Sequence, residues 1–230
     1  MSDAAESNVN GAYKAIREWA TVIGVALIIA FLVRGFVLQQ FYISGPSMES
    51  TMFQDNRVLV NKLSYRLHDI HRGDVVVFDR VTTDGVAVQH DDLIKRVIGI
   101  AGDQISISQC VVSVNGKPIT EPYLNDYDLA QSNLDDRCRV PEMDDVTVES
   151  GHLFVMGDNR PQSFDSRMFG TIDSKLVVGR AFVIIWPVGS FHWLYFQPLT
   201  FRIASDARSG QSLNIPSNPI RNPVVNTSGY

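Results

Sequence analysis

The feature that most restricts how this chain can fold is a long apolar stretch near its N-terminus. Residues 19–33 (WATVIGVALIIAFLV) carry no charge, and after Arg34 the apolar run continues to Leu38, giving 20 residues in all. About 20 residues span the hydrocarbon core of a bilayer, and an arginine near one end can reach the interface. A buried core helix would show a polar face, and a cleaved signal peptide would end in small residues. This run has no polar face and continues into Gln39-Gln40, so it predicts an uncleaved transmembrane anchor at 19–38.

The charges beside this segment favour one orientation. Lys14 and Arg17 precede the anchor, whereas Arg34 is the basic residue at its other end. Basic residues close to a membrane span are more frequent on the cytoplasmic side. We therefore expect residues 1–18 inside the cell and the residues after the anchor outside the cytoplasmic membrane.

Beyond the anchor the pattern is one of short strands rich in β-branched residues and bounded by Gly, Asp or Asn. The expected strands lie at 58–60, 74–78, 93–100, 111–114, 146–148, 153–156 and 176–186. Asn115-Gly116, directly after 111–114, is a strong two-residue hairpin signal. No segment after the anchor keeps a helical period over ten residues. The sequence predicts a mostly β, antiparallel, barrel-like domain, because many short strands must protect their edges.

Composition and charge narrow the remaining possibilities. A net charge of −5 without a basic stripe argues against a nucleic-acid partner. Cys110 and Cys138 allow one disulfide but no zinc site of their own, and we predict that they pair if they lie outside the membrane. Residues 121–149 hold nine acidic residues, which we interpret as a solvated excursion lacking the spacing of a calcium loop. The polar residues 199–230 predict a disordered tail.

A candidate nucleophile follows the anchor directly. Ser47 stands behind Gly45-Pro46, where glycine permits close backbone approach and proline restricts the chain. Taken alone, Gly-Pro-Ser is more often an ordinary turn. A serine nucleophile also needs a base, and none of the five histidines lies in a recognisable triad motif: His68, His71, His90, His152 and His192.

The alternative base is a lysine made neutral by burial. In the expected strand 93–98, Lys95 and Arg96 lie on opposite faces, and both faces are otherwise apolar. A buried arginine stays charged and needs a partner, whereas desolvation lowers the pKa of a buried lysine. Lys95 is therefore a candidate general base. A lysine on an edge strand with its amine in solvent is the alternative reading of the same pattern.

A polar loop supplies the third group of candidates. Residues 157–170 (GDNRPQSFDSRMFG) directly follow a strand. Asp158 or Asp165 could hold Arg167 in a bidentate pair, and Ser163 could orient a neutral lysine amine. The same residues would also suit a capped, hydrogen-bonded turn.

Four blocks together resemble the bacterial type I signal peptidases. They are G-P-S-M at 45–48 after the anchor, R-G-D-V-V-V-F at 72–78, K-R-V-I-G-I-A-G-D at 95–103, and G-D-N-R-x-x-S-x-D-S-R-x-x-G at 157–170. The resemblance covers about residues 14–187 in the family's order. It implies a Ser/Lys peptidase domain at 39–198 with a variable insertion at about 104–150. The implied reaction is removal of signal peptides from exported precursor proteins at the outer face of the cytoplasmic membrane, without a cofactor or metal.

The resemblance also implies a role for each matching residue. Ser47 matches the nucleophile, Lys95 the general base and Ser163 the serine that orients the lysine. Asp165 and Arg167 match the pair that supports the site. Gly45 stands where some members have a serine that contributes to the oxyanion hole, so this chain would use backbone N–H groups there, mainly that of Ser47. The family usually has a proline two residues after the methionine, and here that position is Ser50.

Three functions therefore stay open at the level of sequence. The favoured one is a signal peptidase whose partners are precursor proteins, membrane lipid and, close by, the export translocon. The alternatives are a Ser/Lys peptidase that cleaves its own chain, and a membrane-tethered binding domain with a decayed site.

Overall fold

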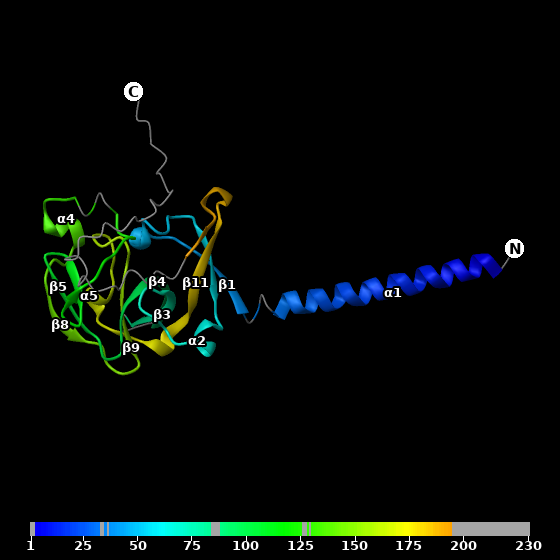
Figure 1. Cartoon of the computed structure of the whole chain (residues 1–230), viewed down its shortest axis with the longest axis horizontal. Coiled ribbons are helices and arrows are strands. Elements are labelled where there is room, and N and C mark those ends of the chain that lie inside the picture. The colour runs from blue at the N-terminus through cyan, green and yellow to red at the C-terminus, as the bar shows by residue number, and fades with distance from the viewer. Residues whose placement is uncertain are drawn as a thin grey trace, which may run out of the picture.

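The computed structural model describes residues 3–32, 35, 37–83, 88–125, 128 and 130–194. Its first element, α1 (Asp3–Leu32), extends away from a β-rich body (Figure 1). The helix exposes apolar side chains on several sides, among them Trp19, Val22, Val25 and Leu27. Within the described residues, no helix meets the length and apolarity needed to cross a membrane. The predicted anchor at 19–38 also contains positions 33, 34 and 36, which lie outside the described residues.

An eight-stranded antiparallel sheet forms the larger part of the body, in the order β1-β2-β11-β3-β4-β9-β10 with β12 paired to β11. Its strands are β1 (Leu38–Tyr42), β2 (Arg57–Asn61), β3 (Val75–Thr83), β4 (Val88–Ile100), β9 (His152–Met156), β10 (Ile172–Asp173), β11 (Val177–Trp186) and β12 (His192–Trp193). Among the described residues no pairing joins β1 to β10, so the sheet is open. The mostly antiparallel β prediction is confirmed, but the expected barrel-like closure is not observed. The outer strand β10 has only two residues, too few to present a long unpaired edge.

A second, four-stranded sheet has the order β7-β6-β5-β8. Its strands are β5 (Gln104–Ser108), β6 (Val111–Val114), β7 (Lys117–Pro118) and β8 (Met143–Thr147). The hairpin predicted at Asn115-Gly116 joins β6 to β7, and both turn residues have positive φ. This sheet and α4 (Leu134–Cys138) lie within the segment 104–150, whose variability between relatives stays a prediction.

The remaining helical elements are single turns. They are α2 (Ser64–Leu67), α5 (Ser166–Phe169), and the 3-10 turns η2 (Pro46–Met48), η3 (Ser174–Leu176) and η4 (Val188–Ser190). Of these, η2 and α5 carry residues of the predicted site.

Three clusters of buried apolar side chains stabilise the body. The first surrounds η2 and includes Ile43, Met48, Met52, Val58 and Val75. Because Met48 and Met52 are fully buried, they fix the turn between β1 and β2 onto the sheet. The second cluster joins the smaller sheet to β4 and β9, and the third lies around β3, β4 and β9. The loop that carries Ser47 is therefore held by its own side chains on both flanks.

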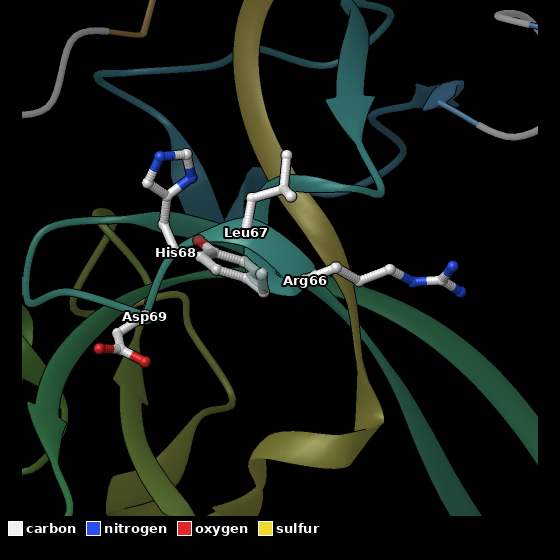
Figure 2. A pocket seen from close by; sticks show the side chains of 5 residues that line it. Arg66, Leu67, His68 and Asp69 are labelled. Atoms are coloured by element: carbon white, nitrogen blue, oxygen red, sulfur yellow. The ribbon is translucent and has the colours of Figure 1, made fainter.

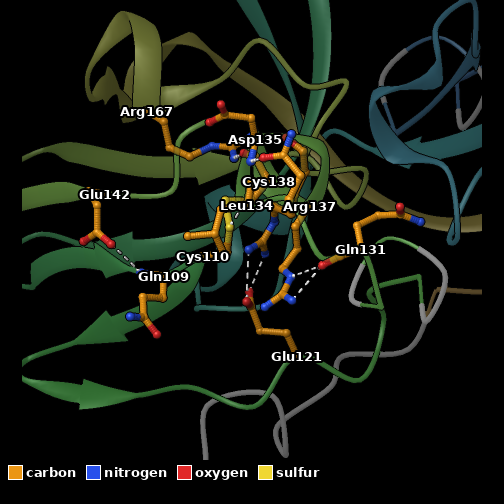
Figure 3. The surroundings of a disulfide bond; sticks show 12 residues. Gln109, Cys110, Glu121, Gln131, Leu134, Asp135, Arg137, Cys138, Glu142 and Arg167 are labelled. Atoms are coloured by element: carbon orange, nitrogen blue, oxygen red, sulfur yellow. Dashed lines mark hydrogen bonds and ion pairs between the residues drawn. A yellow bond between two sulfur atoms is a disulfide. The ribbon is translucent and has the colours of Figure 1, made fainter.

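The excursion at 121–149, which includes β8 of the smaller sheet, departs from expectation in one respect and agrees in another. Cys110 and Cys138 form a disulfide with their Cα atoms 5.7 Å apart, which confirms the predicted pairing (Figure 3). Most of the described acidic residues of 121–149 are solvent-accessible, as predicted. The prediction is wrong for Glu121, because its side chain is buried against Arg160. The predicted tail at 199–230 lies outside the described residues.

Candidate active site

Ser47 lies in the middle of η2, between the sheet and the surface. Pro46 occupies the first helical position, where its missing N–H costs no hydrogen bond, and the backbone N–H of Glu49 closes the turn onto the Pro46 carbonyl at 3.0 Å. Gly45 precedes it in extended conformation, with φ −135° and ψ 160°. Apart from the residues next to Gly45, no heavy atom of the described chain lies within 4 Å of the place that a Gly45 Cβ would occupy. The backbone before Ser47 is thus open to an approaching chain.

Lys95 is brought to Ser47 by the long strand β4. Its Nζ lies 2.7 Å from Ser47 Oγ and 3.0 Å from the carbonyl oxygen of Ile94. The side chain is buried, and desolvation lowers the pKa of Lys95 to about 8, although the charges of Asp165 and Asp158 act in the opposite direction. When the amine is neutral, the Ser47 hydroxyl can donate its proton to Nζ. The arrangement can therefore supply a nucleophile and a base in direct contact.

Arg96, the next residue on β4, reaches Asp158 on the other face of the strand. Its Nε and Nη2 donate to the two oxygens of Asp158 at 2.8 and 2.6 Å, and its Nη1 donates to the Gly73 carbonyl at 3.0 Å. The hydroxyl of Thr51, four residues after Ser47, also donates to Asp158 at 2.5 Å. Of the two acids considered for Arg167, Asp158 therefore belongs to Arg96. Sequence reasoning gave Arg96 and Thr51 no part in the site, although the need of a buried arginine for a carboxylate was a usable signal.

Asp165 holds Arg167 in the bidentate geometry considered from the sequence. Nε and Nη2 of Arg167 donate to its two oxygens at 2.8 Å each, and both side chains are buried. The Gly157 N–H also donates to Asp165, at 3.0 Å. Burial alone would raise the pKa of Asp165, but the hydrogen bond and charge of Arg167 lower it below its usual value. Asp165 therefore remains a carboxylate beside the lysine.

Ser163 and Gly157 complete the contacts beneath the nucleophile. The Ser163 hydroxyl is fully buried and makes no hydrogen bond to Lys95 or to any other described residue, although its proximity helps to lower the pKa of Asp165. A Cβ on Gly157 would overlap both the Ser163 hydroxyl and the Ser47 carbonyl. The same Ser47 carbonyl accepts the N–H of Asn159 at 3.1 Å. The close packing of Gly157 against Ser47 and Ser163 was not predicted from the sequence. The available indication was that a glycine occupies the first position of the 157–170 loop.

The other candidates from the sequence lie elsewhere. His68, His71 and His90 are exposed, and His90 pairs with Asp79. A shallow surface hollow beside α2 is lined by Tyr65, Arg66, Leu67, His68 and Asp69, and it includes no other residue proposed for the site (Figure 2). Within the described parts of the chain, no group of three or more His, Cys, Asp or Glu residues could hold a metal ion.

Comparisons with known proteins show the family of the chain. The family model described as "Signal peptidase, peptidase S26" matches residues 16–186. The chain belongs to this family. Signal peptidase IB of Staphylococcus aureus (strain COL) is 37% identical over 186 residues, which cover 77% of this chain and 93% of the relative. The probable signal peptidase I-2 of Synechocystis is 39% identical over 167 residues, 71% of this chain and 70% of the relative.

A solved family structure covers a smaller part of the chain. The crystal structure of a signal peptidase I from Enterococcus faecalis V583 is 27% identical, covers 49% of this chain and 97% of its own, and has a TM-score of 0.37. Because that score is low, the family assignment stands on the sequence matches.

Proposed function

We propose that this chain is a signal peptidase I, a serine endopeptidase that removes N-terminal signal peptides from exported precursor proteins. The observation that carries the proposal is the 2.7 Å separation between Ser47 Oγ and the Nζ of a lysine whose pKa is lowered to about 8. A base of that pKa is partly neutral at physiological pH and can accept the serine proton. Family membership and the names of the relatives support the same activity.

In the proposed mechanism, neutral Lys95 takes the proton of Ser47 as Oγ attacks the scissile carbonyl carbon. Backbone N–H groups at Gly45–Ser47 stabilise the resulting oxyanion. The carbon–nitrogen bond then breaks, and the protonated Lys95 returns its proton to the leaving amine, which leaves an ester on Ser47. Lys95 next takes a proton from water, whose oxygen attacks the ester, and Ser47 regains its proton as the acid product leaves.

The remaining residues are proposed to support this pair. Asp165 and Arg167 keep a fixed, buried charge pair below the lysine, and Asp158 keeps the Arg96 charge on the other face of β4. Ser163, buried next to Gly157, is proposed to orient the Lys95 amine during the reaction. Its hydroxyl is available for that contact, since it makes no hydrogen bond with the described residues.

We further propose that the enzyme works at the outer face of the cytoplasmic membrane, held by the segment 19–38 with its N-terminus inside. Exposed aromatic side chains on β1, β11 and β12 support this position, among them Tyr42, Trp186 and Trp193. Tyrosine and tryptophan favour the interface between lipid and water. The Cys110–Cys138 disulfide is consistent with an oxidising compartment. Precursors, membrane lipid and a nearby export translocon are the partners that this location implies.

The test is incubation of the purified full-length protein with a precursor in detergent or lipid vesicles. We expect a shortened product whose new N-terminus begins after the signal peptide, and no product from Ser47→Ala. Binding of precursor without cleavage would support the tethered binding domain instead. Fragments of the enzyme itself in the absence of precursor, lost in Ser47→Ala, would support a self-cleaving peptidase.

A further inference from the structure

Two buried polar residues of the excursion have no part in the mechanism above. Glu121 and Tyr123 follow β7, in the segment for which the sequence predicts solvated acidic residues. The Glu121 side chain is only 7% exposed, and so is Tyr123. A buried carboxylate is costly unless a cation and hydrogen bonds compensate for its lost hydration. The partners of Glu121 therefore reveal what holds it there.

Glu121 is bound by an arginine of the catalytic loop. Its Oε2 accepts from Arg160 Nη1 at 3.0 Å, and its Oε1 accepts from Arg160 Nη2 (Figure 3, where dashed lines mark the contacts of Glu121). Arg160 is itself buried, and a buried guanidinium cannot escape its charge by deprotonation. Among the described residues, Glu121 is the carboxylate that forms an ion pair with it. The excursion thus supplies the charge that allows Arg160 to stay inside.

Arg160 also contacts a residue that packs against the nucleophile. Its Nε donates to the Gly157 carbonyl at 2.9 Å. Gly157 packs directly against the Ser47 carbonyl and Ser163, and its N–H donates to Asp165. One series of direct contacts therefore runs from Glu121 through Arg160 and Gly157 to the backbone of Ser47.

Tyr123 and Cys138 attach the same excursion at further points. The Tyr123 hydroxyl donates to Glu121 Oε1 at 2.7 Å, and its ring faces the Arg96 guanidinium at 4.0 Å. The carbonyl of Cys138, one half of the disulfide, accepts from Nη1 of Arg167. The excursion consequently contacts all three arginines around the site: Arg96, Arg160 and Arg167. Such a set of contacts is more than a solvated loop requires.

We propose that Glu121 is a positioning residue of the active site: by neutralising Arg160 it holds Gly157, and with it the 157–167 loop, against Ser47. This inference rests on the proposed roles of Ser47 and Lys95. Tyr123 orients the Glu121 carboxylate, and the disulfide-linked excursion carries both residues to the loop. Small displacements of a nucleophile from its base lower the rate of the chemical step.

Glu121→Gln is the test, because it keeps the shape of the side chain and removes its charge. The matched control is Glu142→Gln on the same excursion, where the exposed carboxylate accepts the backbone N–H of Gln109 and no other hydrogen bond from the described residues. In full-length enzyme with precursor, we expect Glu121→Gln to lower kcat about tenfold or more with little change in KM, since the interaction acts on the chemical step. Glu121→Asp, which keeps the charge, should recover part of the rate, and Glu142→Gln should match the wild type.

Hydrogen exchange provides a readout that does not depend on activity. The Gly157 and Asn159 amides donate to Asp165 and Ser47, so both should exchange faster in Glu121→Gln and not in Glu142→Gln. A folded Glu121→Gln variant with wild-type kcat and unchanged exchange at these two amides would overturn the inference. If wild-type enzyme cleaves no precursor, the proposed function fails, and the exchange experiment still decides the role of Glu121.

Discussion

Lys95 and Arg96 are neighbours on β4 and are buried to the same degree, with 3% of each residue exposed, but their surroundings change the pKa of the two side chains in opposite directions. On one face, Arg96 meets the Asp158 carboxylate, the Gly73 carbonyl and the ring of Tyr123. On the other, Lys95 meets a hydroxyl and a carbonyl, and no ion pair joins it to any described carboxylate. Burial alone would lower the pKa of both side chains.

Whether a carboxylate pairs with the side chain determines how its pKa changes on burial. The charge and hydrogen bonds of Asp158 raise the pKa of Arg96 despite its burial. The more distant charges of Asp165 and Asp158 only partly oppose desolvation at Lys95, whose pKa stays near 8. One strand thus keeps a permanent cation for structure on one face and a titratable amine for chemistry on the other.

The largest expected effect comes from removing the amine. Lys95→Ala and Lys95→Arg should each lower the rate of precursor cleavage by about 10³-fold or more, because general-base catalysis contributes roughly 10²–10⁴-fold. Arginine retains a cation but cannot accept the Ser47 proton. Cleavage is followed by gel and mass spectrometry, with circular dichroism to confirm folding. A folded Lys95→Arg variant that cuts at the wild-type rate would show that Lys95 is not the base.

The next largest effect is expected from breaking the ion pair between Asp158 and Arg96. Asp158→Asn leaves Arg96 buried with its charge uncompensated, and we expect the free energy of unfolding to fall by about 3–5 kcal/mol. Denaturant titration measures the change, with the exposed Asp69→Asn as its control. If Asp158→Asn proved no more destabilising than the control, the Arg96 face would not depend on this pairing.

The directions of Lys95 and Arg96 could be predicted from the sequence, but their partners could not. The alternation at 93–98 was enough to predict that Lys95 and Arg96 face opposite ways against apolar surfaces, because side-chain direction in a strand is local. The choice of carboxylate was not local: Asp158 lies 62 positions from Arg96, and two acids in one loop could serve either of two arginines. The prediction of a barrel-like sheet was wrong for the same reason, because closure depends on which strands, far apart in the sequence, pair at their edges.

The excursion shows a different limit. Nine acidic residues in 121–149 predicted exposure as a group, and composition cannot single out Glu121, whose burial depends on a distant arginine. The pairing of Cys110 with Cys138 was predictable because two cysteines allow only one intramolecular disulfide.

A third prediction concerns stability rather than rate. The pKa of Lys95 is about 8 in the folded chain and about 10.5 when exposed, so the unfolded state binds the proton more tightly. Protonation therefore favours unfolding, and the cost is fully present below pH 8 and disappears as the pH rises through 10.5. Lys95→Met, which cannot titrate, should raise the free energy of unfolding at pH 7 by about 3 kcal/mol and give no such gain near pH 11.

The matching kinetic experiment is the pH profile of wild-type kcat/KM. Because the neutral amine is the active form, the rate should rise with pH and level off above about 8. A rate that kept rising to pH 10, together with a Lys95→Met gain that does not change with pH, would mean that the amine titrates like an exposed lysine.

The smallest effect is expected from a substitution at Ser163, the uncharged residue that is proposed to orient the Lys95 amine. Ser163→Ala removes a buried hydroxyl that makes no hydrogen bond with the described residues, so the folded state should lose little stability. If the hydroxyl orients the amine only during the reaction, kcat should fall by about tenfold, equivalent to about 1.4 kcal/mol in barrier. The exposed Ser44→Ala is the control, and both are assayed with precursor beside Lys95→Ala. A Ser163→Ala variant as inactive as Lys95→Ala would place Ser163 in the chemical step itself, whereas an unchanged kcat would leave the lysine oriented by Ile94 and Ser47 alone.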